Sequence, residues 1–200
     1  MILYLHGFRS SPTSFKARMM AEAMAARGLP AAWACPQLPA SPRQAIELAQ
    51  GIARRQLAGA ADPRALTVIG SSLGGYYATW LAEQLGCQAV LLNPAVEAAR
   101  DLATQVGEHR MYHSDAPFMF LPEYVEELAA LRVDRISQPE RYFLVAATGD
   151  EVLDWREMRD RYAGCRQRIV PGSDHGLSDF ADWMPEVLEF ALGSAPTGPR

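Results

Sequence analysis

The chain has 200 residues, of which 49% are hydrophobic, enough for one domain with a substantial buried core. Its net charge is −4 and its basic residues are scattered, so we expect neither nucleic acid nor an anionic membrane as a partner. No apolar run approaches the roughly 18 residues that span a bilayer, and the N-terminus lacks the features of a signal peptide. These observations predict a soluble cytoplasmic protein, with a single domain over residues 1–192 and a flexible tail over residues 193–200.

Short apolar runs alternate with helical patterns along the chain. The runs that predict strands are residues 2–5, 31–35, 66–69, 89–92, 142–146 and 168–170. This alternation favours an α/β fold, with a mostly parallel sheet of about six strands and crossover helices on both faces. Ser11-Pro12 and Ser41-Pro42 predict two helix starts, because serine caps free amides and proline suits the first helical position.

Residues 66–77 join a predicted buried strand to a predicted helix through Gly70-Ser71-Ser72-Leu73-Gly74. This is the G-x-S-x-G pattern of a nucleophile elbow, a sharp turn that strains the serine backbone and exposes its hydroxyl. Ser72 is the candidate nucleophile, because Ser71 would need glycine at positions 69 and 73. The helix is expected to run to Leu85 and to end at Gly86.

A phosphate-binding loop is the main alternative for the same glycines. Gly70 and Gly75 fit the glycine spacing of that motif, but Tyr76 and Tyr77 occupy the positions of its lysine and its serine or threonine. Nothing at those positions would hold phosphate or magnesium, so the elbow is favoured.

Residues 94–139 interrupt the alternation with a segment longer than a simple crossover. Its methionine and aromatic residues are Met111, Tyr112, Phe118, Met119, Phe120 and Tyr124. Two interpretations remain open, because such residues pack either in the core of an elaborated crossover helix or as the wall of an acyl pocket in a lid over Ser72.

His175 is the expected general base for Ser72. A serine hydroxyl is a poor nucleophile until a base removes its proton, and a carboxylate usually orients that base. His175 lies in the loop 171–176, directly after the last predicted strand and last in the order serine, acid, histidine. Enzymes with a nucleophile elbow carry their base at this position.

Asp150 is the expected acid. It follows the buried run 142–146 through Thr148-Gly149, which places it at the same sheet edge as Ser72. The rival carboxylates have simpler explanations, namely a helix start, a turn and the cap of the last helix. These rivals are Asp154, Asp174 and Asp179.

Two backbone amides are expected to form the oxyanion hole. Leu73 begins the helix after the elbow, so its N–H points outward with the helix dipole behind it. Phe8 follows the first predicted strand in the turn His6-Gly7-Phe8, where the second donor is expected. We assign His6 a structural role in that turn.

No metal or cofactor is expected. His109 and His113 are four residues apart and could share one helical face, but Arg110 stands where the H-E-x-x-H motif requires glutamate. The three cysteines are far apart and lack metal-ligand spacing, which predicts reduced thiols in the core. They are Cys35, Cys87 and Cys165.

Several blocks of this sequence resemble the small bacterial YqiA/YcfP-type esterases over nearly the whole chain. The blocks are residues 4–12, 36–39, 70–80, 93–96 and 148–154. The resemblance implies an α/β-hydrolase fold, activity on acyl esters including acyl-CoA thioesters, and a triad of Ser72, Asp150 and His175. The chain departs from the family where Ser173-Asp174 replace an expected Gly-Asn and over residues 112–124, so acyl specificity is not carried over.

We therefore expect a minimal α/β hydrolase that lacks the first two strands of larger hydrolases. It would cleave a small-molecule acyl ester or thioester through an acyl-enzyme on Ser72. Perhydrolase, haloperoxidase and C–C hydrolase chemistry on the same triad, and a non-catalytic binding protein, remain alternatives, because a fold does not fix a reaction. The substrate, its chain length and the oligomeric state are not predicted.

Overall fold

A parallel six-stranded sheet forms the centre of the computed structural model, which describes residues 1–112 and 114–193. The strand order is β2-β1-β3-β4-β7-β8. The strands are β1 (Ile2–Leu5), β2 (Trp33–Ala34), β3 (Thr67–Ser71), β4 (Gln88–Leu92), β7 (Tyr142–Ala147) and β8 (Arg166–Val170). Every predicted strand is present, with bounds that differ by at most two residues, and the predicted α/β fold is confirmed.

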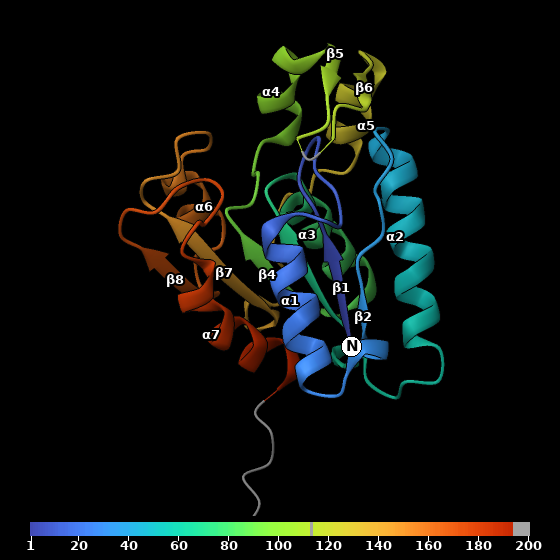
Figure 1. Cartoon of the computed structure of the whole chain (residues 1–200), viewed down its shortest axis with the longest axis vertical. Coiled ribbons are helices and arrows are strands. Elements are labelled where there is room, and N and C mark those ends of the chain that lie inside the picture. The colour runs from blue at the N-terminus through green and yellow to red at the C-terminus, as the bar shows by residue number, and fades with distance from the viewer. Residues whose placement is uncertain (113, 194–200) are drawn as a thin grey trace, which may run out of the picture.

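Helices cover both faces of this sheet (Figure 1). One face packs against α1 (Phe15–Ala26) and α7 (Phe180–Leu192). The other packs against α2 (Pro42–Leu57), α3 (Leu73–Leu85) and α6 (Trp155–Arg161). Successive residues of β1 alternate between the two cores, so Tyr4 faces α1 and α7 while Leu5 faces α2 and α3. Because both faces are buried, the strands are continuous apolar runs.

The two predicted helix starts have different outcomes. Ser41 caps α2 as expected, since its Oγ accepts the Gln44 N–H at 3.2 Å. The predicted start at Ser11-Pro12 is wrong, because α1 begins only at Phe15. The Ser11 side chain instead accepts the Thr13 N–H at 3.2 Å, which closes a local turn ahead of the helix.

Residues 94–139 form a separate group of elements at the top of the view in Figure 1. They contain α4 (Ala98–Leu102), an antiparallel pair of β5 (Gly107–Arg110) and β6 (Pro117–Phe120), and α5 (Glu123–Ala130). One elaborated crossover helix is therefore the wrong description. Burial within the segment is mixed, because Phe120 is buried and Tyr112 is 65% exposed. The function of the segment as a lid stays a prediction.

Short 3₁₀ turns complete the chain: η1 (Pro30–Ala32), η2 (Pro63–Ala65), η3 (Ala103–Gln105) and η4 (Pro139–Arg141).

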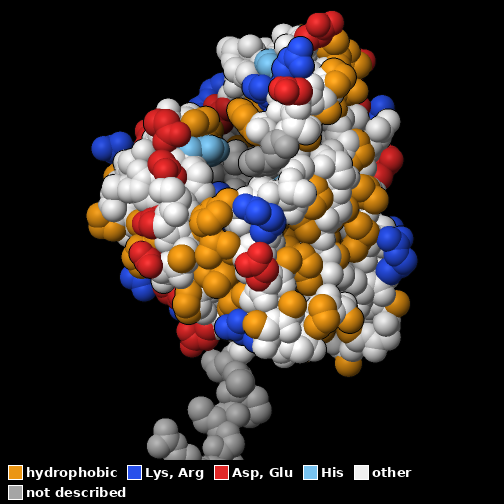
Figure 2. Space-filling view, in the orientation of Figure 1, with side chains coloured by type: hydrophobic (Ala, Val, Ile, Leu, Met, Phe, Trp, Pro, Cys, Tyr) orange, Lys and Arg blue, Asp and Glu red, His pale blue; other side chains and the backbone are white. Residues whose placement is uncertain are grey.

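The three cysteines are free thiols; Cys87 is buried and the other two are half-buried against the cores. Within the described residues, no helix has the length and apolar character to cross a bilayer. On the face in Figure 2, acidic and basic side chains are interspersed. Apart from Gly193, the predicted tail lies outside the described residues.

Candidate active site

The candidate site lies at the carboxyl edge of the parallel sheet. From β1 the chain runs outward to β2 and then returns to β3 on the other side of β1. Such a reversal leaves a crevice at the carboxyl ends of the two strands, where α/β proteins bind ligands. The loops after β1, β3, β7 and β8 bring Phe8, Ser72, Asp150 and His175 to this edge.

Ser72 occupies a strained turn between β3 and α3, with φ 55° and ψ −121°. Both glycines of the pattern are sterically required. A Cβ on Gly70 would lie 2.1 Å from the Gly74 carbonyl oxygen, and one on Gly74 would lie 1.9 Å from the Leu5 carbonyl oxygen. This close approach lets the strand and helix meet at a sharp angle with the serine between them. Tyr76 and Tyr77, which decided against a phosphate loop, are buried in α3.

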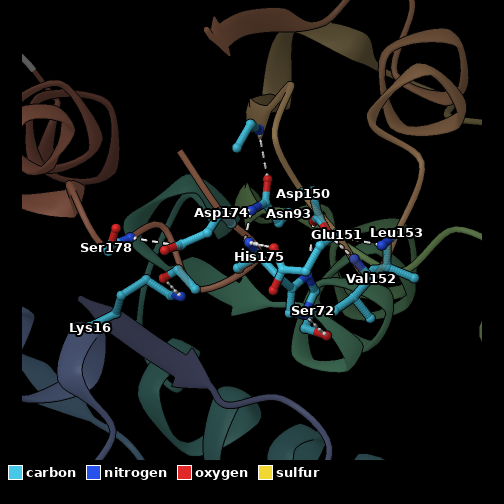
Figure 3. A network of polar contacts seen from close by, with 12 residues as sticks. Lys16, Ser72, Asn93, Asp150, Glu151, Val152, Leu153, Asp174, His175 and Ser178 are labelled. Carbon is cyan, nitrogen blue, oxygen red and sulfur yellow. Dashed lines mark hydrogen bonds and ion pairs between the residues drawn. The ribbon is translucent and has the colours of Figure 1, made fainter. Parts of the chain in front are cut away.

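Ser72, His175 and Asp150 form a continuous chain of hydrogen bonds (Figure 3). The Ser72 Oγ lies 3.0 Å from His175 Nε2, and His175 Nδ1 lies 2.8 Å from Asp150 Oδ2. A carboxylate only accepts hydrogen bonds, so Nδ1 donates to Asp150 and Nε2 accepts the Ser72 O–H. The Asp150 side chain is 0% exposed and that of His175 is 21% exposed. The structure thus brings together the three residues singled out from the sequence.

Backbone amides fix the Asp150 carboxylate from its other side. Its Oδ1 accepts the N–H groups of Val152 at 2.9 Å and Leu153 at 2.8 Å. The loop after β7 therefore wraps around its own aspartate and leaves Oδ2 for His175. With both oxygens engaged, the carboxylate is held in the orientation that the histidine needs.

The rival carboxylates serve local structure. Asp154 caps α6 by accepting the Arg156 N–H at 2.9 Å, and Asp174 accepts the Ser178 N–H at 3.0 Å. Asp179 stands at the start of α7, but its side chain makes no capping bond. Its two carboxylate oxygens instead accept from Ser173 Oγ and Trp183 Nε1.

The loop after β1 lies directly against the nucleophile. A Cβ on Gly7 would come within 3.2 Å of Ser72 Cβ. Among the described residues, neither the Phe8 amide nor the Leu73 amide donates a hydrogen bond, so both are available near the serine. His6 is 4% exposed, and its Nε2 accepts the Leu38 N–H at 3.0 Å.

Asn93 is a residue of this site that sequence reasoning missed as such. It follows β4 with φ 43°, and its Nδ2 donates to the carbonyl oxygens of Asp174 at 3.0 Å and His175 at 3.1 Å. Its Oδ1 accepts the Ala147 N–H at 2.8 Å. Asn93 therefore ties the loop that carries His175 to β7. The available signal was an asparagine, tolerant of positive φ, directly after a buried strand.

Two further charged residues hold the same loop. Glu151 accepts the His175 N–H at 3.0 Å, and Lys16 Nζ donates to the Gly176 carbonyl oxygen. Glu151 could have been noticed as the neighbour of Asp150, and Lys16 as the only lysine in the sequence.

A cleft of about 810 Å³ opens over the triad. Its apolar wall combines Phe15, Leu102, Tyr112, Val152 and Leu153. Of these, Leu102 and Tyr112 come from the segment 94–139, so part of that segment faces the site. Clefts of this size hold drug-sized ligands and metabolites.

Of the two histidines considered as metal ligands, His109 is not part of a helix. His109 lies in β5, where its Nε2 donates to the Gln105 carbonyl oxygen at 2.6 Å and its ring meets Phe8 edge-on. His113 lies outside the described residues. Within the described part of the chain, no cluster of His, Cys, Asp and Glu has the arrangement of a metal site.

Comparison with solved structures finds the same fold in hydrolases. A proposed hydrolase from Agrobacterium vitis S4 is 18% identical with a TM-score of 0.72, over 96% of this chain and 87% of that chain. A monoacylglycerol lipase from Paleococcus ferrophilus is 15% identical with a TM-score of 0.69, over 97% and 94%. Est1E from Butyrivibrio proteoclasticus is 15% identical with a TM-score of 0.66, over 94% and 84%.

These similarities establish the α/β-hydrolase fold, while the family follows from the sequence itself. The model of the uncharacterised protein family UPF0227 matches residues 1–192, nearly the whole chain. The chain therefore belongs to UPF0227, the YqiA/YcfP family that its sequence blocks resemble.

Proposed function

We propose that this chain is a serine hydrolase that cleaves carboxylic esters, thioesters included, through an acyl-enzyme on Ser72. The observation that carries the proposal is the hydrogen-bond chain from Ser72 through His175 to the buried Asp150, at 3.0 and 2.8 Å. Ser72 and His175 line the cleft, and the nucleophile elbow holds Ser72 there. Nucleophile, base and orienting acid each have the partner that acyl transfer requires.

In the acylation step, Ser72 Oγ attacks the carbonyl carbon of the substrate while His175 Nε2 takes the hydroxyl proton. The Asp150 carboxylate stabilises the imidazolium that forms. When the tetrahedral intermediate collapses, the bond to the alcohol or thiol breaks and the imidazolium donates its proton to the leaving group. Water, activated by the same histidine, then attacks the acyl-enzyme and releases the carboxylic acid.

The amides of Phe8 and Leu73 are the proposed donors to the tetrahedral oxyanion. Both belong to segments that border Ser72, and Leu73 opens a helix of 13 residues whose dipole favours negative charge at its start. Each such donor contributes roughly 3 kcal/mol to transition-state stabilisation. The apolar wall of the cleft supports an acyl substrate, because it would bury the hydrocarbon chain beside the reacting carbonyl.

The decisive test compares Ser72→Ala with Ser71→Ala on p-nitrophenyl esters and acyl-CoA thioesters graded by chain length. S72A should lower kcat by about 10⁶, because the triad acts as a unit. Ser71 is the matched control, since it is the adjacent serine, is 8% exposed and ends β3. S71A should keep kcat within about threefold of the wild type, a change of less than 1 kcal/mol. An S72A protein that is folded and still hydrolyses these esters would refute the assignment of the nucleophile.

A fluorophosphonate probe separates the enzyme from a binding protein on the same fold. The proposal requires labelling of Ser72, detected by mass spectrometry of the modified peptide, in wild type and S71A but not in S72A. Peracid formation faster than ester hydrolysis would favour a perhydrolase instead. A folded wild-type protein that neither reacts with the probe nor turns over any ester would identify a binding protein.

A further inference from the structure

Lys16 is unusual in both its sequence and its position. It is the only lysine among 19 basic residues, the rest being arginine. It lies in the first turn of α1, is 9% exposed and lines the cleft beside the triad. Burying an ammonium group is costly unless hydrogen bonds and opposite charges compensate for the lost hydration. The groups that contact the Lys16 ammonium therefore show how its buried charge is stabilised.

Those partners belong to the loop of the general base and to its acid (Figure 3). The Lys16 ammonium donates to the carbonyl oxygen of Gly176, the residue after His175. Burial lowers the pKa of Lys16 to about 8, and the Asp174 and Asp150 carboxylates oppose that shift by favouring the charged form. Lys16 is thus coupled by charge to the catalytic acid and by a hydrogen bond to the segment that bears the base.

Three side chains, from α1 and from the loops after β4 and β7, hold the backbone around His175. Asn93 donates to the carbonyl oxygens of residues 174 and 175, Glu151 accepts the His175 N–H, and Lys16 donates to the next carbonyl oxygen. Of these three, Lys16 alone is positively charged. Removing its charge would leave the imidazole among the carboxylates of Asp150, Glu151 and Asp174 without this counter-charge.

We propose that Lys16 is a positioning residue that fixes the His175 loop against α1 and balances the carboxylates around the imidazole. The inference rests on the proposed hydrolase function and adds a residue that the Ser-His-Asp arrangement does not contain. The positive charge of Lys16 would also repel a second positive charge on the imidazole of the loop that it holds.

The test is Lys16→Met, which keeps most of the length of the side chain and removes the charge, with Arg18→Met as the control. Arg18 is an exposed cation two residues further along α1. K16M should lower kcat about tenfold with KM within about twofold, because a small misplacement of the base slows the chemical step. The acidic limb of its kcat/KM profile should move to higher pH. R18M should leave kcat, KM and the profile unchanged.

Thermal stability separates this role from simple packing. Lys16 has a folded-state pKa of about 8, below its ordinary 10.5. Between these values the unfolded chain binds more protons, so this lysine makes stability rise with pH there, and below pH 8 its buried charge lowers stability. K16M should therefore melt at a higher temperature than the wild type at pH 6.5, and the difference should shrink above pH 8. A lower melting temperature at pH 6.5 with an unshifted pH profile would overturn the proposal.

A measurement on the wild type guards against misfolding of the variant. With [ε-¹³C]lysine, the single lysine gives one NMR signal, which should titrate near pH 8 and move to lower pH in Asp174→Asn. Titration at the ordinary value, with no response to D174N, would contradict the charge coupling.

The proposed function and the role of Lys16 can be refuted separately. An S72A protein that keeps esterase activity would refute the hydrolase mechanism. An inactive S72A protein, together with a K16M protein that has wild-type kinetics, would refute only the role of Lys16.

Discussion

The sheet edge that carries the triad and the segment 94–139 above it are built in different ways. At the edge, Ser72, Asp150 and His175 each follow a strand of one parallel sheet, so the register of β3, β4, β7 and β8 places them together. The described residues of the segment 94–139 contribute no strand to that sheet. Its position depends on individual side-chain and backbone contacts with other elements.

Two of these attachments hold α5. The Glu127 carboxylate accepts Ser41 Oγ–H at 2.7 Å and the Arg43 N–H at 3.0 Å, so it caps the start of α2 from outside that helix. The Tyr76 hydroxyl donates to the Leu128 carbonyl oxygen at 2.9 Å, which ties α5 to α3. The comparison teaches that topology places the groups of the proposed triad at the sheet edge, whereas the segment adds a cleft wall and supports through particular contacts.

The largest effect expected at the sheet edge, after loss of Ser72 itself, comes from Asp150→Asn. The amide can present N–H to His175 and favour the tautomer whose Nε2 carries a proton, so kcat should fall by about 10⁴. Steady-state ester hydrolysis measures this loss. Asp154→Asn is the control, because Asp154 lies four residues away in sequence, caps α6 and pairs with Arg156 on that helix. Equal losses of kcat in D150N and D154N would show that Asp150 is not the acid.

The next largest effect is a loss of folding stability on substitution of a glycine in the elbow. Gly74→Ala would place Cβ 1.9 Å from the Leu5 carbonyl oxygen, an overlap with backbone that no rotamer can relieve. We expect the free energy of unfolding of G74A, measured by urea denaturation, to be at least about 4 kcal/mol lower than that of the wild type.

Gly51→Ala is the matched control for that elbow substitution. Gly51 lies inside α2, and its Cβ would meet only Arg55 at an ordinary 3.6 Å. Alanine in an open helical position should raise the unfolding free energy by roughly 0.5–1 kcal/mol. A G74A protein within about 1 kcal/mol of the wild type would show that strand and helix can separate, contrary to the close contact at the elbow.

The triad could be predicted because its signals are local. The glycine spacing around Ser72 follows from steric requirements within five residues, and Asp150 and His175 each follow a predicted strand. The residues that hold the His175 loop were missed for the opposite reason. Lys16 and Asn93 act on backbone carbonyl groups more than 80 residues away, and no spacing in the sequence encodes such contacts.

The segment 94–139 could not be predicted in the same way. β5 reads Gly-Glu-His-Arg and has no apolar periodicity, because it pairs only with β6 and is partly exposed on both faces. The aromatic residues of the segment suggested either core or lid, and the structure divides them. Phe120 is buried, Phe118 is half-buried against Phe8, and Tyr112 is exposed at the cleft.

One set of contacts links the two regions, because the hairpin of β5 and β6 packs on the loop that carries Phe8. The Phe8 ring meets Phe118 and Phe120 edge-on, with centroids 5.1 and 5.2 Å apart. Arg9 donates through Nε to the Arg110 carbonyl oxygen at 2.7 Å. The segment therefore supports the loop of the proposed oxyanion donor, besides lining the cleft.

The smallest predicted effect tests this support. Phe118→Ala should loosen the Phe8 loop and lower kcat about tenfold, a fraction of the 10²–10³ expected for complete loss of an oxyanion donor. Phe118 does not line the cleft over Ser72, so KM should change little. Met119→Ala is the control, because Met119 is the next residue of β6 and is 43% exposed. A kcat in F118A equal to that in M119A would restrict the segment to a wall of the cleft, whereas a selective loss would make it part of the machinery that stabilises the transition state.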